Sequence, residues 1–293
     1  MSAAGKRGEL LVVGTPIGNL EDLSPRAQRA LAEADAIFCE DTRVTAKLAA
    51  RFGIRTPRIS CPAPREKTRA AGLLERLGRG ETVALVSDAG MPLLSDPGKD
   101  LVAAAAEAGF PVRVVPGPSA ASAALAVSGL PVVPHYFAGF LPARAGERRR
   151  FLEELAGRTE TLVWFEAPHR LVESLADAAR ALGPRRACVA RELTKLHEEA
   201  ARGTLRELAE RFAGRGAARG EATVVVEGRG TDSPAEAAGA GDLDRRIAEA
   251  LAAGRDKRAI ARALARETGL PSRRIYARAV ELAEFDDPGA RSR

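Results

Sequence analysis

The chain has 293 residues, 45 of them basic and 39 acidic, a formal net charge of +6, and 45% hydrophobic but only 4% aromatic residues. This length accommodates two ordinary domains with some surplus, and the composition excludes a disordered, collagen-like or coiled-coil chain. Three scattered cysteines cannot make a disulfide framework, and no CxxC or HExxH motif is present, so we expect no metal. We expect a cytoplasmic protein, because no apolar run is long enough for a signal peptide or a membrane span.

Short apolar runs alternate with helix-like segments in the first part of the chain. The expected strands are residues 9–13, 36–39, 83–87 and 112–115. Ser24 followed by Pro25 is typical of a helix start, and glycines stand just past several amphipathic segments. This alternation indicates a parallel sheet with crossover helices, so we predict an α/β domain over residues 1–118.

A second alternating set follows. The expected strands are residues 135–140, 161–165, 187–191 and 222–227, with helices over 148–155, 169–182 and 205–212. We therefore predict a second α/β domain over residues 119–230. Residues 231–241 are rich in Gly, Ala, Ser, Pro and Asp without periodicity, which is typical of a linker.

The segment 242–285 predicts a small helical domain with helices over 242–253, 255–268 and 272–284. The middle helix is expected to carry arginines on one side, namely Arg255, Arg258, Arg262 and Arg266, and apolar residues opposite, namely Ile260, Ala263 and Leu264. Ten basic residues stand against three acidic ones between positions 245 and 278. This pattern favours nucleic-acid contact, and the alternative is an Arg-rich solvated face.

Four loops with unusual composition follow the strands of the first domain. They are residues 14–19, 40–43, 88–98 and 116–119. Ligands in open α/β sheets bind outside the carboxyl ends of the strands, so we expect these loops to form a cleft for a nucleoside-sized molecule. An aspartate such as Asp88 could accept hydrogen bonds from ribose or balance a cationic ligand. No GxGxxG or GxxxxGK[ST] motif occurs, which disfavours a dinucleotide or phosphate cradle.

Six ordered motifs resemble the tetrapyrrole-methylase superfamily of S-adenosylmethionine enzymes. They are residues 15–20, 40–43, 87–90 with 96–98, 116–118, 139–142 and 191–195. The resemblance covers nearly the whole chain. It implies two α/β domains with a cofactor cleft between them, a homodimer, and S-adenosyl-L-methionine as the cofactor. Within the superfamily, the motifs are similar to those of the branch that methylates the ribose 2'-hydroxyl of cytidine 1402 in 16S rRNA at the ribosomal decoding site.

The resemblance also implies site residues. The cofactor-binding set is Thr15, Pro16, Asp88, Gly90, Pro116, Gly117 and Ser119. Candidate proton acceptors at predicted strand ends are Glu40, Asp41, Glu66 and Glu192, with Lys195 as an electrostatic partner. The resemblance implies a His-Asn-Glu sequence after the third strand, whereas this chain has Cys61-Pro62-Ala63-Pro64-Arg65-Glu66 and lacks the His and the Asn. Met91 and the Leu93-Leu94 pair could pack on the adenine or belong to the core.

Clustered arginines predict the RNA-binding surface. The expected contacts are Arg144, Arg148, Arg149, Arg150, Arg258 and Arg262. The partner implied is 16S rRNA or the small ribosomal subunit. Because aromatic residues are few, we expect base stacking to be minor. Two alternatives stay open: a methyltransferase for a tetrapyrrole-type small molecule, and a noncatalytic RNA-binding assembly factor with a methylase fold.

Overall fold

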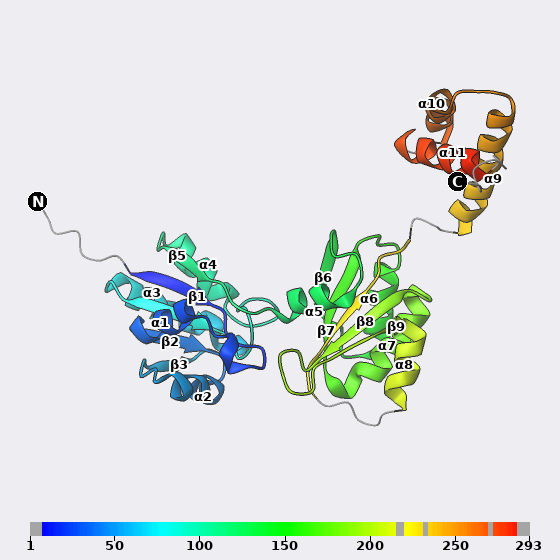
Figure 1. The fold of residues 1–293 in the computed structure, drawn as a ribbon. Coiled ribbons are helices and arrows are strands. Elements are labelled where there is room, and N and C mark those ends of the chain that lie inside the picture. The colour runs from blue at the N-terminus through cyan, green and yellow to red at the C-terminus, as the bar shows by residue number, and fades with distance from the viewer. Residues whose placement is uncertain (1–7, 215–219, 231–233, 269–271, 286–293) are drawn as a thin grey trace, which may run out of the picture. The chain divides into compact units, whose positions relative to one another are not determined.

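The computed structural model describes residues 8–214, 220–230, 234–268 and 272–285 (Figure 1). The chain divides into two compact units, Met1–Arg229 and Gly230–Arg293, and we describe each by itself. The first unit contains two five-stranded sheets, and the second is helical. This arrangement confirms the predicted α/β fold class with a helical appendage. The domain boundary at residue 118 stays a prediction.

The first sheet contains five parallel strands in the order β3-β2-β4-β1-β5. They are β1 (Glu9–Val13), β2 (Ala36–Cys39), β3 (Arg58–Ser60), β4 (Thr82–Val86) and β5 (Val112–Val115). The crossover helices are α1 (Pro25–Glu33), α2 (Thr42–Phe52), α3 (Glu66–Gly78) and α4 (Lys99–Glu107). Ser24 caps α1 as predicted, since its side chain accepts a hydrogen bond from the Ala27 amide. Strand β3 was not among the strands expected from apolar runs, because it spans only three residues with no apolar run.

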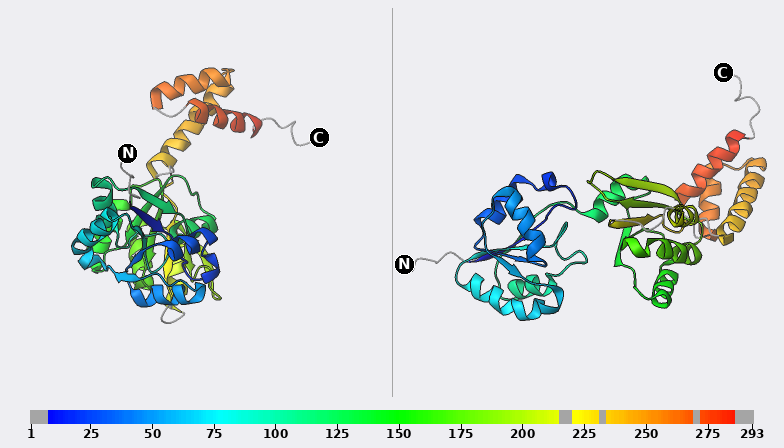
Figure 2. Two further views of the ribbon diagram at one scale, coloured as in Figure 1. Left: turned by 90° about the vertical axis from the view of Figure 1, so that its left-hand side faces the viewer. Right: turned by 90° about the horizontal axis from the view of Figure 1, so that it is seen from below.

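Helices cover both faces of this sheet (Figure 2). Ile37 and Ala84 pack on one face against α1 and α2, while Phe38 and Leu85 pack on the other against α3 and α4. Burial on both faces explains why the strands are continuous apolar runs rather than alternating ones. Because all five strands are parallel, the loops that follow them gather at one edge.

The second sheet is mixed, with strand order β6-β7-β10-β8-β9, and only β6 and β7 pair in parallel. Its strands are β6 (His135–Phe140), β7 (Thr161–Glu166), β8 (Arg186–Arg191), β9 (Glu199–Thr204) and β10 (Ala222–Val226). Helix α5 (Ala120–Ser128) covers one face. The other face carries α6 (Ala145–Leu155), α7 (Leu171–Leu182) and α8 (Leu205–Ala213). The sequence analysis missed β9, a charged edge strand with low intrinsic strand propensity.

The second unit contains α9 (Pro234–Ala252), α10 (Lys257–Thr268) and α11 (Ser272–Phe285) around Ile247, Ile260 and Ile275. The predicted linker is wrong from Pro234 onward, because residues 234–241 belong to α9; residues 231–233 lie outside the described part of the chain. Proline at the first position and the abundance of alanine favour this helix despite its two glycines. Three short 3-10 turns complete the elements: Leu20–Asp22, Ala63–Arg65 and Pro168–Arg170. No described helix is both long and apolar enough to cross a membrane.

Candidate active site

The loops after β1 and β4 are joined by backbone hydrogen bonds. The Thr15 amide donates to the Gly90 carbonyl at 2.9 Å, and the Gly90 amide donates to the Thr15 carbonyl at 3.1 Å. The buried Thr15 hydroxyl donates to the Ser87 carbonyl at 3.2 Å. Gly90 has a φ of +82°, a left-handed conformation that favours glycine. Two strand ends are therefore held together at the centre of the sheet.

The loops after β1 and β5 approach even more closely, at Gly14 and Gly117. A Cβ atom on Gly14 would lie 2.6 Å from the Gly117 Cα, and a Cβ on Gly117 would lie 2.8 Å from the Gly14 carbonyl carbon. These distances are too short for any side chain larger than hydrogen, so glycine is required at both positions. The predicted cofactor residues Pro116 and Gly117 thus belong to the backbone support of the site, and neither lines its cavity.

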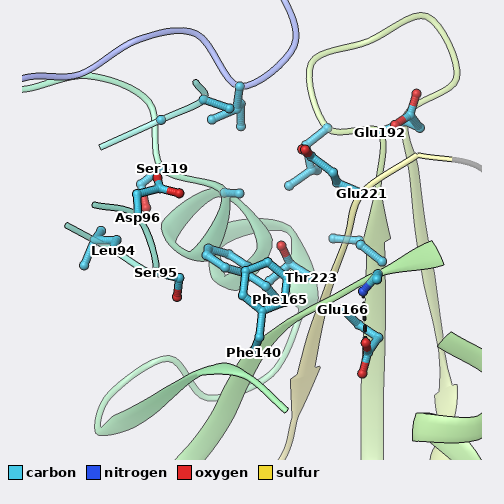
Figure 3. Close-up of a pocket in the computed structure, with 18 of the residues that line it drawn as sticks. Leu94, Ser95, Asp96, Ser119, Phe140, Phe165, Glu166, Glu192, Glu221 and Thr223 are labelled. Atoms are coloured by element: carbon cyan, nitrogen blue, oxygen red, sulfur yellow. Dashed lines mark hydrogen bonds between the residues drawn. The ribbon is translucent and has the colours of Figure 1, made fainter. Parts of the chain in front are cut away.

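A cavity of about 340 Å³ opens where these loops meet the second sheet (Figure 3). The loops of the first sheet contribute chiefly Ile17, Asp88, Gly90, Met91, Leu94, Ser95, Asp96 and Ser119. The second half contributes chiefly Phe140, Phe165, Glu166, Glu192, Leu193, Lys195, Glu221 and Thr223. Its size suits a small-molecule ligand, and its walls come from segments far apart in the sequence.

Contacts between loops hold the two walls of the cavity together. The Asn19 amide donates to the Thr194 hydroxyl at 3.1 Å. Gly18 lies against Lys195, where an added Cβ would be 2.6 Å from the Lys195 Cγ. The loop after β1 therefore contacts the loop between β8 and β9, which is why both contribute to one site.

Carboxylates dominate the charge of the cavity. Asp88, Asp96, Glu166, Glu192 and Glu221 line it, whereas Lys195 is the single basic side chain among its described lining residues. Lys195 pairs with Glu192 at 3.0 Å, and Arg170 pairs with Glu166 at 2.7 Å. This excess of acidic groups favours a ligand that carries positive charge.

Asp96 is the site residue that the sequence analysis did not select. The sequence places it near a helix start, but Gly98 occupies the N-cap of α4 and the Asp96 side chain lines the cavity. Burial raises the pKa of Asp96 to about 6, and the charges of Glu40, Asp88 and Glu221 act in the same direction. Burial likewise raises the pKa of Asp88. A perturbed carboxyl group in a cleft is a typical sign of a functional site.

Of the predicted cofactor residues, Asp88, Gly90 and Ser119 line this cavity. Thr15 and Pro16 line a neighbouring cavity of about 230 Å³, to which Asp88 also contributes. Asp88 thus reaches both spaces, while its Oδ1 accepts a hydrogen bond from the Asp41 amide at 3.1 Å. Met91 and Leu94 also line the larger cavity, whereas Leu93 does not and packs against the core of the first sheet, as Met91 also does.

Two of the predicted proton acceptors are helix caps instead. Asp41 accepts hydrogen bonds from the Arg43 amide and guanidinium, which lower its pKa to about 2 and make it a weak base. Glu66 is buried, where it accepts from the Asp100 and Leu101 amides at the start of α4. Neither residue lines the cavity, and neither does Glu40. Only Glu192 and Lys195 of the predicted set do.

The structure corrects one of the predicted RNA contacts. Arg148 is 2% exposed, and its guanidinium pairs with Asp177 at 2.7 Å, so it is not available at the surface. The helical spacing of Arg148, Leu152 and Leu155 puts these three residues on the buried face of α6. Arg149 also pairs with Asp177 but is half exposed, and Arg144, Arg150, Arg258 and Arg262 are exposed. Those five remain predictions.

The fold and the site define a class of protein. Residues 9–209 match the family of Tetrapyrrole (Corrin/Porphyrin) Methylases, so the chain belongs to that family. Solved structures with this fold include the methyltransferase CobJ, with a TM-score of 0.59 and 23% identity over 77% of this chain and 96% of that one. Another is uroporphyrin-III C-methyl transferase from Thermus thermophilus complexed with S-adenyl homocysteine. It has a TM-score of 0.52 and is 24% identical, over 75% of this chain and 96% of that one.

Curated relatives narrow the class further. The chain is 44% identical to Ribosomal RNA small subunit methyltransferase I of Halalkalibacterium halodurans, over 92% of this chain and 94% of that protein. It is 45% identical to the protein of the same name from Xylella fastidiosa, over 92% and 98%. The Thermotoga maritima protein of that name matches at 45% over 222 residues, which is 76% of this chain and 99% of its own length. That length is close to the length of the first unit alone.

Proposed function

We propose that this protein methylates the RNA of the small ribosomal subunit, with S-adenosyl-L-methionine as methyl donor. The observation that carries the proposal is the acidic cavity at the carboxyl ends of β1 and β4, in a chain 45% identical to a ribosomal RNA methyltransferase. By resemblance, the acceptor is the ribose 2'-hydroxyl of cytidine 1402 in 16S rRNA. The excess of arginine between positions 245 and 278, ten basic residues against three acidic ones, favours an RNA substrate over a tetrapyrrole-type one.

The cavity residues fit S-adenosylmethionine, which supplies a methyl group on a positively charged sulfonium. Asp88 and Asp96 lie where that charge would be stabilised, and Ile17, Met91 and Ala120 offer apolar surface for the adenine. The related uroporphyrin-III C-methyl transferase was solved with S-adenyl homocysteine, the demethylated product of this donor. Positioning the acceptor oxygen in line with the methyl group can supply about 7–11 kcal/mol of the barrier.

We further propose Glu192 as the residue that accepts the proton of the ribose hydroxyl. It lines the cavity and has a φ of +48°, a strained conformation held by the loop between β8 and β9. Lys195 lies 3.0 Å from its Oε1 and would stabilise the developing negative charge on the acceptor oxygen. A general base at this position contributes about 10²- to 10⁴-fold, less than positioning does.

A methylation assay tests this function. We expect the protein to transfer tritium from labelled S-adenosylmethionine to small ribosomal subunits that lack the modification. Asp88→Asn should weaken cofactor binding about 10- to 100-fold, because a charged hydrogen-bond acceptor is lost while the amide oxygen still accepts from Asp41. The surface variant Glu75→Gln is the control, since its side chain is 70% exposed. Calorimetry measures the affinity.

Two outcomes would contradict the proposal. Label that enters a precorrin-type substrate but no ribosomal RNA would indicate a small-molecule methyltransferase. Absence of S-adenosylmethionine binding in calorimetry would indicate a noncatalytic RNA-binding factor. Mass spectrometry of the labelled RNA would then identify the nucleotide and the modified atom.

The exposed arginines give a salt-dependence prediction. We expect two double variants to weaken RNA binding to the same extent for every RNA sequence. One is Arg149→Gln with Arg150→Gln, and the other is Arg258→Gln with Arg262→Gln. Each lost phosphate contact should reduce the slope of log affinity against log salt by about 0.7 if the RNA is single-stranded there. Arg51→Gln on α2 is the control for loss of charge alone. Filter binding at several salt concentrations measures the slope, and an unchanged slope in both pairs would exclude these surfaces.

The homodimer and the cytoplasmic location also stay proposals. Val114 on the edge strand β5 is 57% exposed, which favours a contact surface there, since edge strands of parallel sheets are commonly covered. A cytoplasmic location follows from the proposed ribosomal substrate.

A further inference from the structure

Phe140 is an unusually exposed aromatic residue for this chain. It ends β6, lines the cavity, and is 54% exposed, and no other phenylalanine between residues 8 and 214 is exposed. Exposure of a large apolar side chain costs solvation free energy, and the chain has only 9 Phe, 2 Tyr and 1 Trp. A half-exposed wall residue lies where the cavity opens to solvent, the side from which a polymeric substrate must enter.

A β-bulge in β6 places the Phe140 side chain on the same face of the strand as Phe137, next to Phe165. The register between β6 and β7 shifts between Phe137 and Phe140. Regular alternation would place these two rings on opposite faces of the strand, because they are three residues apart. With the bulge, both rings contact Phe165, at centroid distances of 5.0 Å and 5.5 Å. Bulges next to active sites commonly redirect a side chain in this way.

The bulge is built against the loop after β4. Gly139 has a φ of +67°, and an added Cβ would lie 3.2 Å from the Ser95 hydroxyl. Ser95 itself has a φ of +74° without being glycine. A left-handed turn that suits glycine at Gly139 therefore meets an unfavourable backbone conformation at Ser95 beside the position of Phe140. Strain of the Ser95 kind persists where the surrounding structure requires it.

We propose that Phe140 is the stacking platform for the base of the nucleotide that is methylated. This inference rests on the proposed function. Carboxylates and apolar residues of the first-sheet loops line the part of the cavity proposed for the cofactor. Phe140 comes from the second half, lies beside Phe165 in the cavity wall (Figure 3), and remains 54% exposed. Sequence-specific RNA recognition commonly uses unpaired bases that can be splayed out, and an exposed aromatic ring offers such a base a stacking surface.

The neighbouring charge supports the same substrate. Arg144 follows Phe140 by four residues, and its side chain is 84% exposed. Four residues of chain span at most about 14 Å, so a cation lies within reach of the phosphates that flank a base on Phe140. Stacking at this one position would be the exception to the expectation, drawn from the low aromatic content, that base stacking is minor.

Steady-state kinetics on unmodified small ribosomal subunits, with calorimetry of S-adenosylmethionine binding, test this inference. We expect Phe140→Ala to lower kcat/KM for the subunit about 5- to 150-fold, which is the usual range for one base on one aromatic ring. Cofactor affinity should stay within about twofold. Phe140→Trp should retain most of the wild-type kcat/KM. Phe140→Leu, which keeps the apolar volume without an aromatic face, should lose about as much kcat/KM as Phe140→Ala. Leu196→Ala, at a side chain 93% exposed outside the cavity lining, is the matched control.

Each remaining outcome decides against the inference. If Phe140→Ala weakens S-adenosylmethionine binding as much as it lowers kcat/KM, the ring contacts the adenine of the cofactor. If Phe140→Leu equals the wild type, the position needs only apolar bulk. If Phe140→Ala retains full kcat/KM while the wild type methylates the subunit, the inference fails and the proposed function stands. A wild type that methylates no ribosomal RNA overturns both.

Discussion

Gly117→Ala is expected to destabilise the protein and to weaken S-adenosylmethionine binding at least tenfold. The added Cβ would lie 2.8 Å from the carbonyl carbon and the Cα of Gly14, and neither backbone atom can rotate away. If the ends of β1 and β5 are pushed apart, the loops that follow them move, and with them the lining residues Ile17 and Ser119. Overpacking of this kind costs about 1–3 kcal/mol of unfolding free energy. Thermal unfolding and calorimetry measure the two effects.

The chain offers a matched control for this substitution. Gly72 lies in α3, and an added Cβ there meets nothing within 4 Å. Gly72→Ala should therefore stabilise the protein by about 0.5–1 kcal/mol, because alanine loses less backbone entropy in a helix. Equal effects of the two substitutions would show that the contact between Gly14 and Gly117 does not support the site.

Asp96→Asn is expected to make the protein more stable and a weaker binder of S-adenosylmethionine. Burial raises the pKa of Asp96 in the folded state to about 6, above its ordinary value of 3.8. Between pH 3.8 and about 6 the folded state holds more protons on this group than the unfolded state. The free energy of unfolding therefore falls progressively as pH rises through this range, and the whole loss is present above pH ~6. Allowing for solvent screening, Asn should add about 1 kcal/mol at pH ~8 and nothing below the ordinary value.

Ligand charge separates this role from a general effect on the cavity. S-adenosylmethionine affinity of the wild type should rise with pH through about 6 as Asp96 ionises, and the Asp96→Asn profile should be flatter. S-adenosylhomocysteine, which lacks the sulfonium charge, should lose less affinity than S-adenosylmethionine in the variant. Calorimetry across pH with both ligands provides the comparison. Equal losses for the two ligands would mean that Asp96 acts on another part of the cofactor.

The position of a charged side chain at a strand end does not predict its partner. Glu66, Asp41 and Glu192 all follow strands, yet the first two cap helices and the third lines the cavity. Arg148, Arg149 and Arg150 are consecutive, yet only Arg148 is buried, because successive residues of a helix point in different directions. The spacing of Arg148 with Leu152 and Leu155 was the signal available for that distinction.

The parallel sheet and its loops could be predicted from local sequence, because strands buried on both faces are apolar throughout and tight turns need glycine and proline. Helical periodicity and the density of arginine likewise predicted the helical appendage. That Asp96 faces a cavity, and that a bulge turns Phe140 toward it, became visible in the folded chain alone. Those properties depend on atoms from distant segments, and local patterns of polarity carry no information about which segments meet.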